Sequence, residues 1–126
     1  MRKRENFGRA FANLSDIFEC DEPYSNVELA GIVGLFEICF EQSWKAMKEF
    51  LQEEGYSEGD TGSPRQILKM AYATELIEDE DAWLAALVDR NNVVHAYDEG
   101  VALAIVKNTK TRYYSLFEKL HNKLTQ

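Results

Sequence analysis

Apolar residues along most of this chain recur at steps of three and four, the period of an amphipathic helix. Alternation at every second position, which is typical of a half-buried strand, is almost absent. The apolar stripes predict helices over about residues 3–20, 26–54 and 64–76, a fourth from about 80, and a last one that ends near 124. Two long helices and short connections predict an all-α fold: an up-and-down antiparallel four-helix bundle with one accessory helix.

Start signals between the stripes support these boundaries. Ser25 followed by Glu28 fits a capping box, in which each side chain satisfies a free backbone N–H of the first turn. Ser63, followed by Pro64, predicts a second helix start after a polar loop at 56–64. The acidic stretch 78–81 predicts an N-cap and favourable charge at the start of the fourth helix.

Several residues within the stripes are interpreted as packing residues. Trp44 and Trp83 lie at helical spacing and are predicted to be core. Cys39 lies in the apolar stretch LFEICF and is predicted to be a small buried hydrophobe. Gly31 and Gly34 weaken the second helix, so we expect a neighbouring element to pack closely against them.

Length and charge limit the classes of function. The chain has 126 residues, enough for a single domain over 1–126, and 45% of them are hydrophobic. Its net charge of −8 predicts no broad surface for polyanions, so DNA is not an expected partner, and RNA or nucleotide contact requires a local basic pocket. No apolar run is long enough for a membrane span, which predicts a soluble, cytoplasmic protein. No metal site is expected, because no CxxC pair is present and His95 and His121 are far apart in sequence. No cofactor is expected either.

The segment DRNNVVHAYDE, residues 89–99, holds the candidate chemistry between two helices. Continuing the neighbouring stripes places Arg90 and His95 on inward faces, provided that the last helix begins as early as His95. A bend is expected at Asn91–Asn92, because Asn tolerates turn conformations. A guanidinium can hold phosphate oxygens, and an imidazole can exchange a proton with a ribose 2′-hydroxyl. The phenol of Tyr97 could stack on a base, donate a hydrogen bond, or accept a nucleotidyl group.

A structural interpretation of the same segment stays open at this point. Arg90 could pair with Asp98 or Glu99 of the next helix, while His95 caps carbonyl groups. An R-x4-H spacing is also common by chance, so these few residues alone do not define a site.

A longer pattern accompanies the segment. Its residues are Ser43, Trp44, Lys45, Met47, Phe50, Leu51, Gly55, Ser63, Pro64, Arg65, Leu76, Ile77, Trp83, Asp89, Arg90, Asn91, His95, Tyr97, Asp98 and Glu99. Over about residues 5–125 this pattern resembles the nucleotidyltransferase substrate-binding proteins of the HEPN superfamily. The resemblance implies a helical bundle that forms homodimers, with two R-x4-H segments facing one cleft, and that binds a separately encoded minimal nucleotidyltransferase.

The resemblance also implies roles for individual residues. Arg90, His95 and Asn91 would be catalytic in members that are metal-independent ribonuclease toxins. Arg90, His95, Tyr97 and Asp98 would contact a nucleotide or other substrate. Tyr97 occupies the position at which the partner adds AMP in pairs that carry R-x4-H-x-Y.

Three functions therefore remain open. The first is a nucleotide- or substrate-binding subunit that acts with its nucleotidyltransferase partner. The second is a ribonuclease toxin that the partner neutralises through Tyr97, and the third is a purely structural dimeric bundle. The chain lacks the Gly-Ser and Asp-x-Asp pattern of a nucleotidyltransferase, so we expect it not to transfer nucleotides alone.

Overall fold

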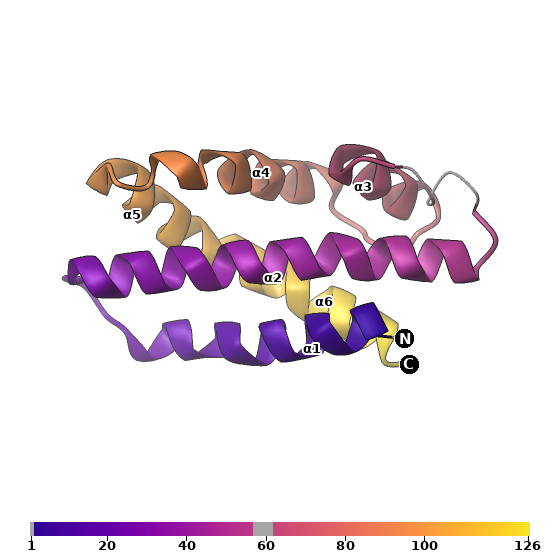
Figure 1. Ribbon diagram of the computed structural model, residues 1–126, viewed down its shortest axis with the longest axis horizontal. Helices are drawn as coiled ribbons and strands as arrows, with labels where there is room; N and C mark the ends of the chain where they lie inside the picture. The colour runs from indigo at the N-terminus through magenta and orange to yellow at the C-terminus, as the bar shows by residue number, and fades with distance from the viewer. Residues whose placement is uncertain (1, 57–61) are drawn as a thin grey trace.

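Helix α2 (Asn26–Glu53) runs along the length of the protein, and the other helices pack against it (Figure 1). The computed structural model describes residues 2–56 and 62–126, and within them the chain is all-helical with no strand. The remaining helices are α1 (Arg2–Leu14), α3 (Pro64–Ala73), α4 (Glu80–Asn91), α5 (Glu99–Asn108) and α6 (Tyr114–Leu124). A π-helical turn, Thr109–Tyr113, joins α5 and α6 into one continuous helix, so the described residues form five helices.

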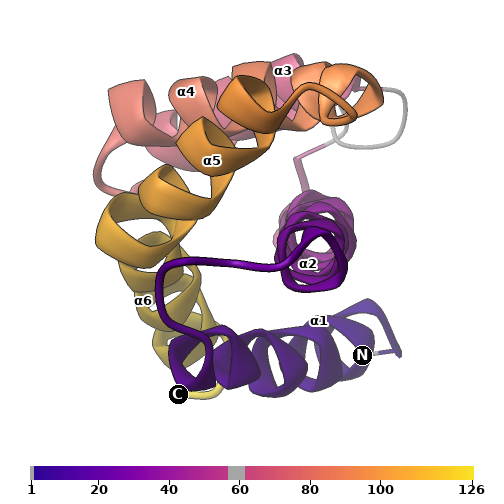
Figure 2. The same ribbon diagram turned by 90° about the vertical axis from the view of Figure 1, so that its left-hand side faces the viewer.

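The end-on view shows how these helices surround the core (Figure 2). Helices α1, α2, α4 and the joined α5–α6 lie at the sides of the bundle, while the short α3 extends the layer of α4. The predicted all-α four-helix bundle with one accessory helix is therefore confirmed, and α3 is the accessory helix.

The predicted helix starts agree with the structure. Ser25 and Glu28 exchange the two hydrogen bonds of a capping box, at 2.8 and 3.1 Å, and Ser63 forms the same motif with Gln66. Asp79 is the N-cap of α4, since its Oδ1 accepts a hydrogen bond from the Ala82 N–H at 3.0 Å. Most of the loop predicted at 56–64 lies outside the described residues.

The first helix differs from the prediction near its end. Helix α1 stops at Leu14, and a 3-10 helix continues over Ser15–Glu19. The apolar stripe does not distinguish the two forms, because a 3-10 segment also brings residues three apart onto one side.

Aromatic side chains from four helices meet in the core. Phe36 of α2 stacks on Tyr113 at 5.5 Å between ring centroids, and Trp83 of α4 meets Phe117 of α6 edge-on at 5.5 Å. Such pairs contribute about 0.5–1.5 kcal/mol beyond the area that they bury. Cys39 is fully buried beside them, so the predictions for Trp83 and Cys39 are confirmed.

One face of α2 has no neighbour in the described chain. A Cβ added at Gly31 or Gly34 would meet no atom within 4 Å, so the expected close packing against another element is wrong. The apolar stripe of α2 that packs into the core lies on its other side. Val27 and Ile38 are 82% and 55% exposed, and the open face is therefore a mixture of small and apolar residues. No helix in the described ranges is long and apolar enough to cross a membrane.

Candidate functional site

The segment 89–99 connects α4 to α5 through a tight bend. Helix α4 ends at Asn91, and a single 3-10 turn, Asn92–His95, follows it. Helix α5 begins at Glu99 with Asp98 as its N-cap, because the Asp98 Oδ1 accepts a hydrogen bond from the Val101 N–H at 3.1 Å. At Asn91–Asn92, where a bend was predicted, the α-helix changes to a 3-10 helix with both residues in helical conformation, and the turn into α5 lies at 96–98. A contact between Asp98 and a substrate stays a prediction.

Arg90 points from α4 toward α2, as predicted. Its Nε forms an ion pair with Glu41 of α2, and its guanidinium lies 5.8 Å from the centre of the Phe40 ring. Arg90 Nη1 also donates a hydrogen bond to Asn91 Oδ1 at 2.9 Å. These contacts leave 24% of the Arg90 side chain exposed. The partner of Arg90 is thus Glu41 and not Asp98 or Glu99.

Glu41 is itself held in place by Trp44. The Trp44 Nε1–H donates a hydrogen bond to Glu41 Oε2 at 3.1 Å, one helical turn along α2. Trp44 is partly buried and packs against the edge of the core, so its predicted core position is confirmed only in part. The apolar stripe indicated only packing for Trp44 and gave no sign of its hydrogen bond. The step of three residues from Glu41 to Trp44 could have indicated this contact, because side chains at that spacing meet on a helix.

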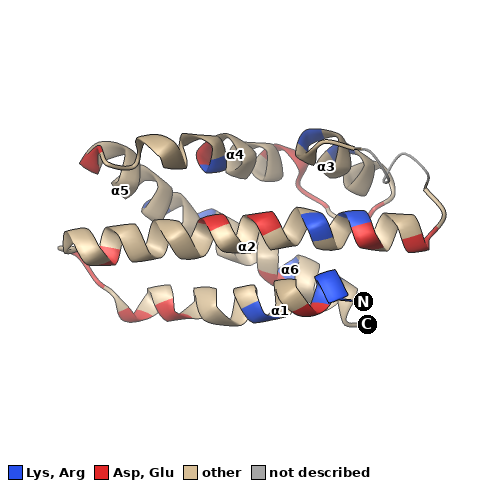
Figure 3. Cartoon of the chain, viewed as in Figure 1, with Lys and Arg blue, Asp and Glu red and all other residues tan. Residues whose placement is uncertain are grey.

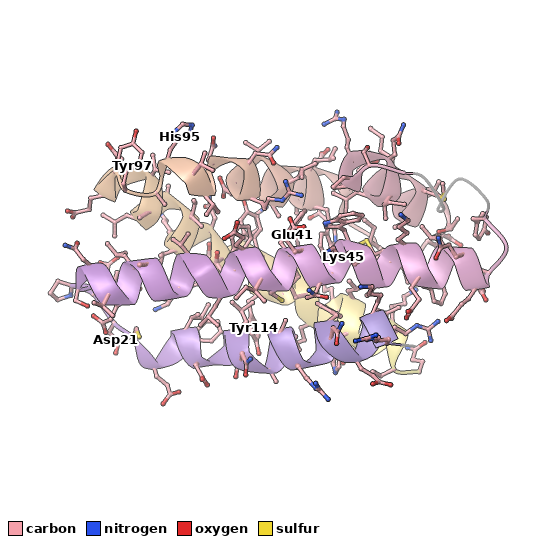
Figure 4. The ribbon with its side chains drawn as sticks, in the orientation of Figure 1. Asp21, Glu41, Lys45, His95, Tyr97 and Tyr114 are labelled. Atoms are coloured by element: carbon pink, nitrogen blue, oxygen red, sulfur yellow. The ribbon has the colours of Figure 1, made fainter. Side chains whose placement is uncertain are left out.

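His95 lies on the outer surface and not on an inward face. The prediction assumed that the last helix begins near His95, whereas α5 begins four residues later at Glu99. His95 is exposed, and Tyr97 is 88% exposed. Their rings meet edge to face, 6.5 Å apart (Figure 4). Figure 4 also shows that both residues point away from α2, whereas Glu41 lies between α2 and α4.

Arg90 and His95 therefore diverge within one chain. The guanidinium lies against α2, the imidazole lies outside the 3-10 turn, and no hydrogen bond joins them. One guanidinium and one imidazole placed this way do not converge on a single small group. A site that uses both requires either a movement of Arg90 or a second chain.

Below Arg90, a partly buried network fixes the end of α4. Asp89 Oδ2 accepts hydrogen bonds from Tyr113 Oη at 2.7 Å and from Asn108 Nδ2 at 3.0 Å. Burial, together with the hydrogen bond to Asp89, raises the pKa of the Tyr113 phenol well above its usual value. Sequence patterns did not indicate this network, because its residues come from two neighbouring helices, α4 and the joined α5–α6, and are far apart in sequence.

The π-helical turn is what allows two residues of one helix to reach Asp89. Asn108 and Tyr113 are five positions apart, which corresponds to about 140° of rotation in an α-helix. A π-helical turn pairs residue i with residue i+5, so it brings these two side chains to the same side. The π-helical turn between α5 and α6 therefore fixes the position of Asp89, the residue next to Arg90.

A groove of about 450 Å³ connects this segment to the open face of α2. Its walls include Ala96 and Tyr97 on one side and Val33, Gly34 and Glu37 on the other. The groove is largely apolar, apart from Asn26, Glu37 and Glu99, and Arg90 does not line it.

Charge around the segment is mostly negative. Figure 3 shows acidic positions on α1, α2, α4 and the connections, in agreement with the net charge of −8. Glu41 already pairs with Arg90, so little free positive charge remains there. Within residues 2–56 and 62–126, no group of His, Cys, Asp and Glu side chains has an arrangement that could hold a metal ion.

The ion pair between Arg90 and Glu41 gives a first prediction. Glu41→Ala is expected to lower the free energy of unfolding by about 1–2 kcal/mol, between the effects typical of exposed and of buried pairs. The cause is the partly buried guanidinium, which loses its counter-charge. Urea unfolding measures the change. The exposed Glu37, one helical turn earlier, is the control, and equal effects of Glu37→Ala and Glu41→Ala would contradict the assigned pair.

An all-α bundle with an R-x4-H segment at the junction of two helices defines a HEPN-type domain. The chain belongs to the family described as "Nucleotidyltransferase substrate binding protein like", whose family model matches residues 2–126. A crystal structure of a protein from Thermus thermophilus is similar, with a TM-score of 0.83 and 30% identity, covering 95% of this chain and 99% of that one.

Two further similarities come from Haemophilus influenzae. A solved structure described as the fold of a substrate binding domain of a nucleotidyltransferase has a TM-score of 0.75 and 25% identity, and the match covers 99% of this chain and 96% of that one. A protein named "Probable ribonuclease HepT" is 35% identical over 79 residues, which are 61% of this chain. That match spans 54% of the relative, about half of its length.

Proposed function

We propose that this protein is the substrate-binding HEPN subunit of a two-component system whose other member is a separately encoded nucleotidyltransferase. The family described above supports a nucleotidyltransferase as the partner. The observation that carries the proposal is the exposure of Tyr97, 88% of which is accessible on the segment that also presents His95. This phenol is available to the active site of a partner protein.

In this proposal Tyr97 is the residue that the partner modifies. Its phenolic oxygen attacks the α-phosphorus of ATP, and a new P–O bond forms. The bond between the α-phosphorus and the bridging oxygen breaks, pyrophosphate leaves, and the phenol proton passes to a base of the partner. The added phosphodiester places a negative charge beside His95, the ring that Tyr97 contacts at 6.5 Å.

Co-expression with the nucleotidyltransferase encoded beside this chain tests the proposal. We expect intact-mass spectrometry to show one or more added adenylyl groups, and peptide mapping to place the first on Tyr97. Tyr97→Phe should remove it. Tyr72→Phe is the matched control, since Tyr72 is 47% exposed on α3, outside the segment. Unmodified Tyr97 in a complex supplied with ATP would contradict the proposal.

A second function, metal-independent ribonuclease activity, is supported by two observations. The first is the name of the HepT relative, and the second is the presence on one segment of a side chain suited to phosphate binding, Arg90, and one suited to proton transfer, His95. In this function Arg90 stabilises the charge on the phosphate, His95 is the general acid or base, and Asn91 holds Arg90 through its hydrogen bond. Nucleotide addition at Tyr97 would then silence cleavage.

Both functions fit a homodimer better than a monomer. The open face of α2, with Gly31, Gly34 and the exposed Ile38, continues into the groove beside Tyr97. A second copy on this face would bury these residues and place two segments 89–99 near one another. A purely structural dimer is the remaining alternative, and it predicts neither modification nor RNA cleavage.

A further inference from the structure

A second hollow lies far from the segment 89–99, between the connection of α3 to α4 and one face of α6. Its volume is about 450 Å³. Leu76 and Trp83 line it from one side, and Leu116 of α6 lines it from the other. No residue of α2 or of the segment 89–99 lines this cavity, so it is separate from the candidate site.

Three cationic side chains of the joined α5–α6 helix surround the cavity. Arg112, Lys119 and Lys123 recur at steps of seven and four, which places them along one side of the helix. Lys123 Nζ donates a hydrogen bond to the carbonyl oxygen of Glu75 at 3.2 Å and so fixes the turn after α3. Arg112 and Lys119 are exposed, and neither forms an ion pair within the described chain.

The opposite wall of the cavity carries acidic groups. Asp79 lines it but already accepts the N-cap hydrogen bond from Ala82, and Glu78 is exposed. Among the described residues, no ion pair connects these carboxylates to the cations on α6. The cavity is therefore polarised, with the cations on the α6 side, the carboxylates of Glu78 and Asp79 on the other, and apolar side chains at the floor between them.

Size and polarity together define the ligand class. Small-molecule sites in proteins have volumes of about 300–1,000 Å³, apolar walls and a few fixed polar groups. Cations on one wall suit a phosphate, and the apolar side chains at the floor of the cavity suit one face of a planar ring. We infer that this cavity binds a mononucleotide-like organic phosphate, with its phosphate at Arg112 and Lys119 and its base over the apolar floor beside Glu78. The inference does not depend on the proposed function, since the two sites share no residue.

Isothermal titration calorimetry of the full chain with AMP tests the inference. We expect AMP to bind at least about tenfold more tightly than adenosine, which lacks the phosphate, and than inorganic phosphate, which lacks the base. The double variant Arg112→Gln with Lys119→Gln should weaken AMP binding at least about tenfold. The control, Arg65→Gln with Lys107→Gln, removes the same charge from exposed positions outside the cavity and should bind normally.

Two more variants complete the test. Ser115→Phe fills the cavity while both cations remain, and it should also lose AMP binding. Ser115→Ala changes the same position without filling the cavity, and it should retain AMP binding. No heat of binding up to about 1 mM AMP, roughly a thousandfold above a Kd of about 1 μM, would overturn the inference. Equal affinity for adenosine, equal affinity of the Arg112 and Lys119 double variant, or loss of binding in Ser115→Ala would also overturn it.

Discussion

His95→Ala is expected to lower RNA cleavage by about 10²–10⁴-fold if the protein acts as a ribonuclease, since that is the typical contribution of a general acid or base. The imidazole is exposed and accessible to a ribose 2′-hydroxyl or a leaving oxygen. Arg90→Ala should cause a loss of similar size, because a guanidinium stabilises the charge that grows on the phosphate. Cleavage of a labelled RNA, measured in EDTA and in the absence of the nucleotidyltransferase, gives both rates.

Mixing the two variants distinguishes a shared site from a site within one chain. Arg90 and His95 point in different directions within one protomer. If the Arg90 of one chain works with the His95 of its partner, Arg90→Ala chains mixed with His95→Ala chains should recover part of the activity. A site within one chain predicts no recovery, since neither variant then has both groups.

Glu99→Gln is the control for these two variants. Glu99 lies in the same segment and is exposed at the start of α5. No contact with the substrate is assigned to it, so cleavage should be unchanged. Full cleavage by His95→Ala, with folding confirmed by circular dichroism, would exclude His95 as the general acid or base. Cleavage lost only on addition of EDTA would exclude the metal-independent mechanism.

Asp89→Ala is expected to lower the free energy of unfolding by about 3 kcal/mol. The substitution leaves the Tyr113 hydroxyl and the Asn108 amide without their acceptor, and each unsatisfied buried group costs about 1–3 kcal/mol. Because the total free energy of unfolding of a domain is about 5–15 kcal/mol, this loss is a large fraction of its stability. Urea unfolding followed by circular dichroism measures the change. Glu118→Ala, on an exposed position of α6, should change stability by less than about 0.5 kcal/mol.

The same network predicts a dependence on alkaline pH. Burial and the hydrogen bond to Asp89 raise the pKa of Tyr113 in the folded state above the value of about 10 expected when unfolded. A group whose pKa is raised by folding contributes its full stability below the unfolded pKa, and this contribution is lost as the pH rises above it. The native chain should have a higher free energy of unfolding than Tyr113→Phe at neutral pH, and this difference should become smaller between about pH 9 and 11. An advantage that is constant over this range would contradict the assigned pKa shift.

The helical elements follow from local patterns, and these were readable from the sequence. The capping residues Ser25, Ser63 and Asp79 start helices as predicted, because a cap needs only residues within one turn. The inward direction of Arg90 was also predictable, because it continues the stripe of α4.

The partners of the site residues were not predictable. Glu41 meets Arg90, and Asp89 meets Tyr113, across the bundle, so no spacing along the chain indicates these contacts. The error for His95 arose from a helix boundary, which moves a side chain from one face to another within a few residues. The π-helical turn has no signal in the apolar pattern.

The ion pair of Arg90 with Glu41 has a consequence for any phosphate that binds there. The carboxylate occupies the guanidinium in the free protein and acts as an internal competitor. If releasing Arg90 requires about 1.4 kcal/mol, only about one chain in ten is ready to bind at a given moment, and the apparent affinity falls by the same factor. A phosphate group on a polymer, held nearby by other contacts, overcomes this threshold more easily than a free phosphate ion.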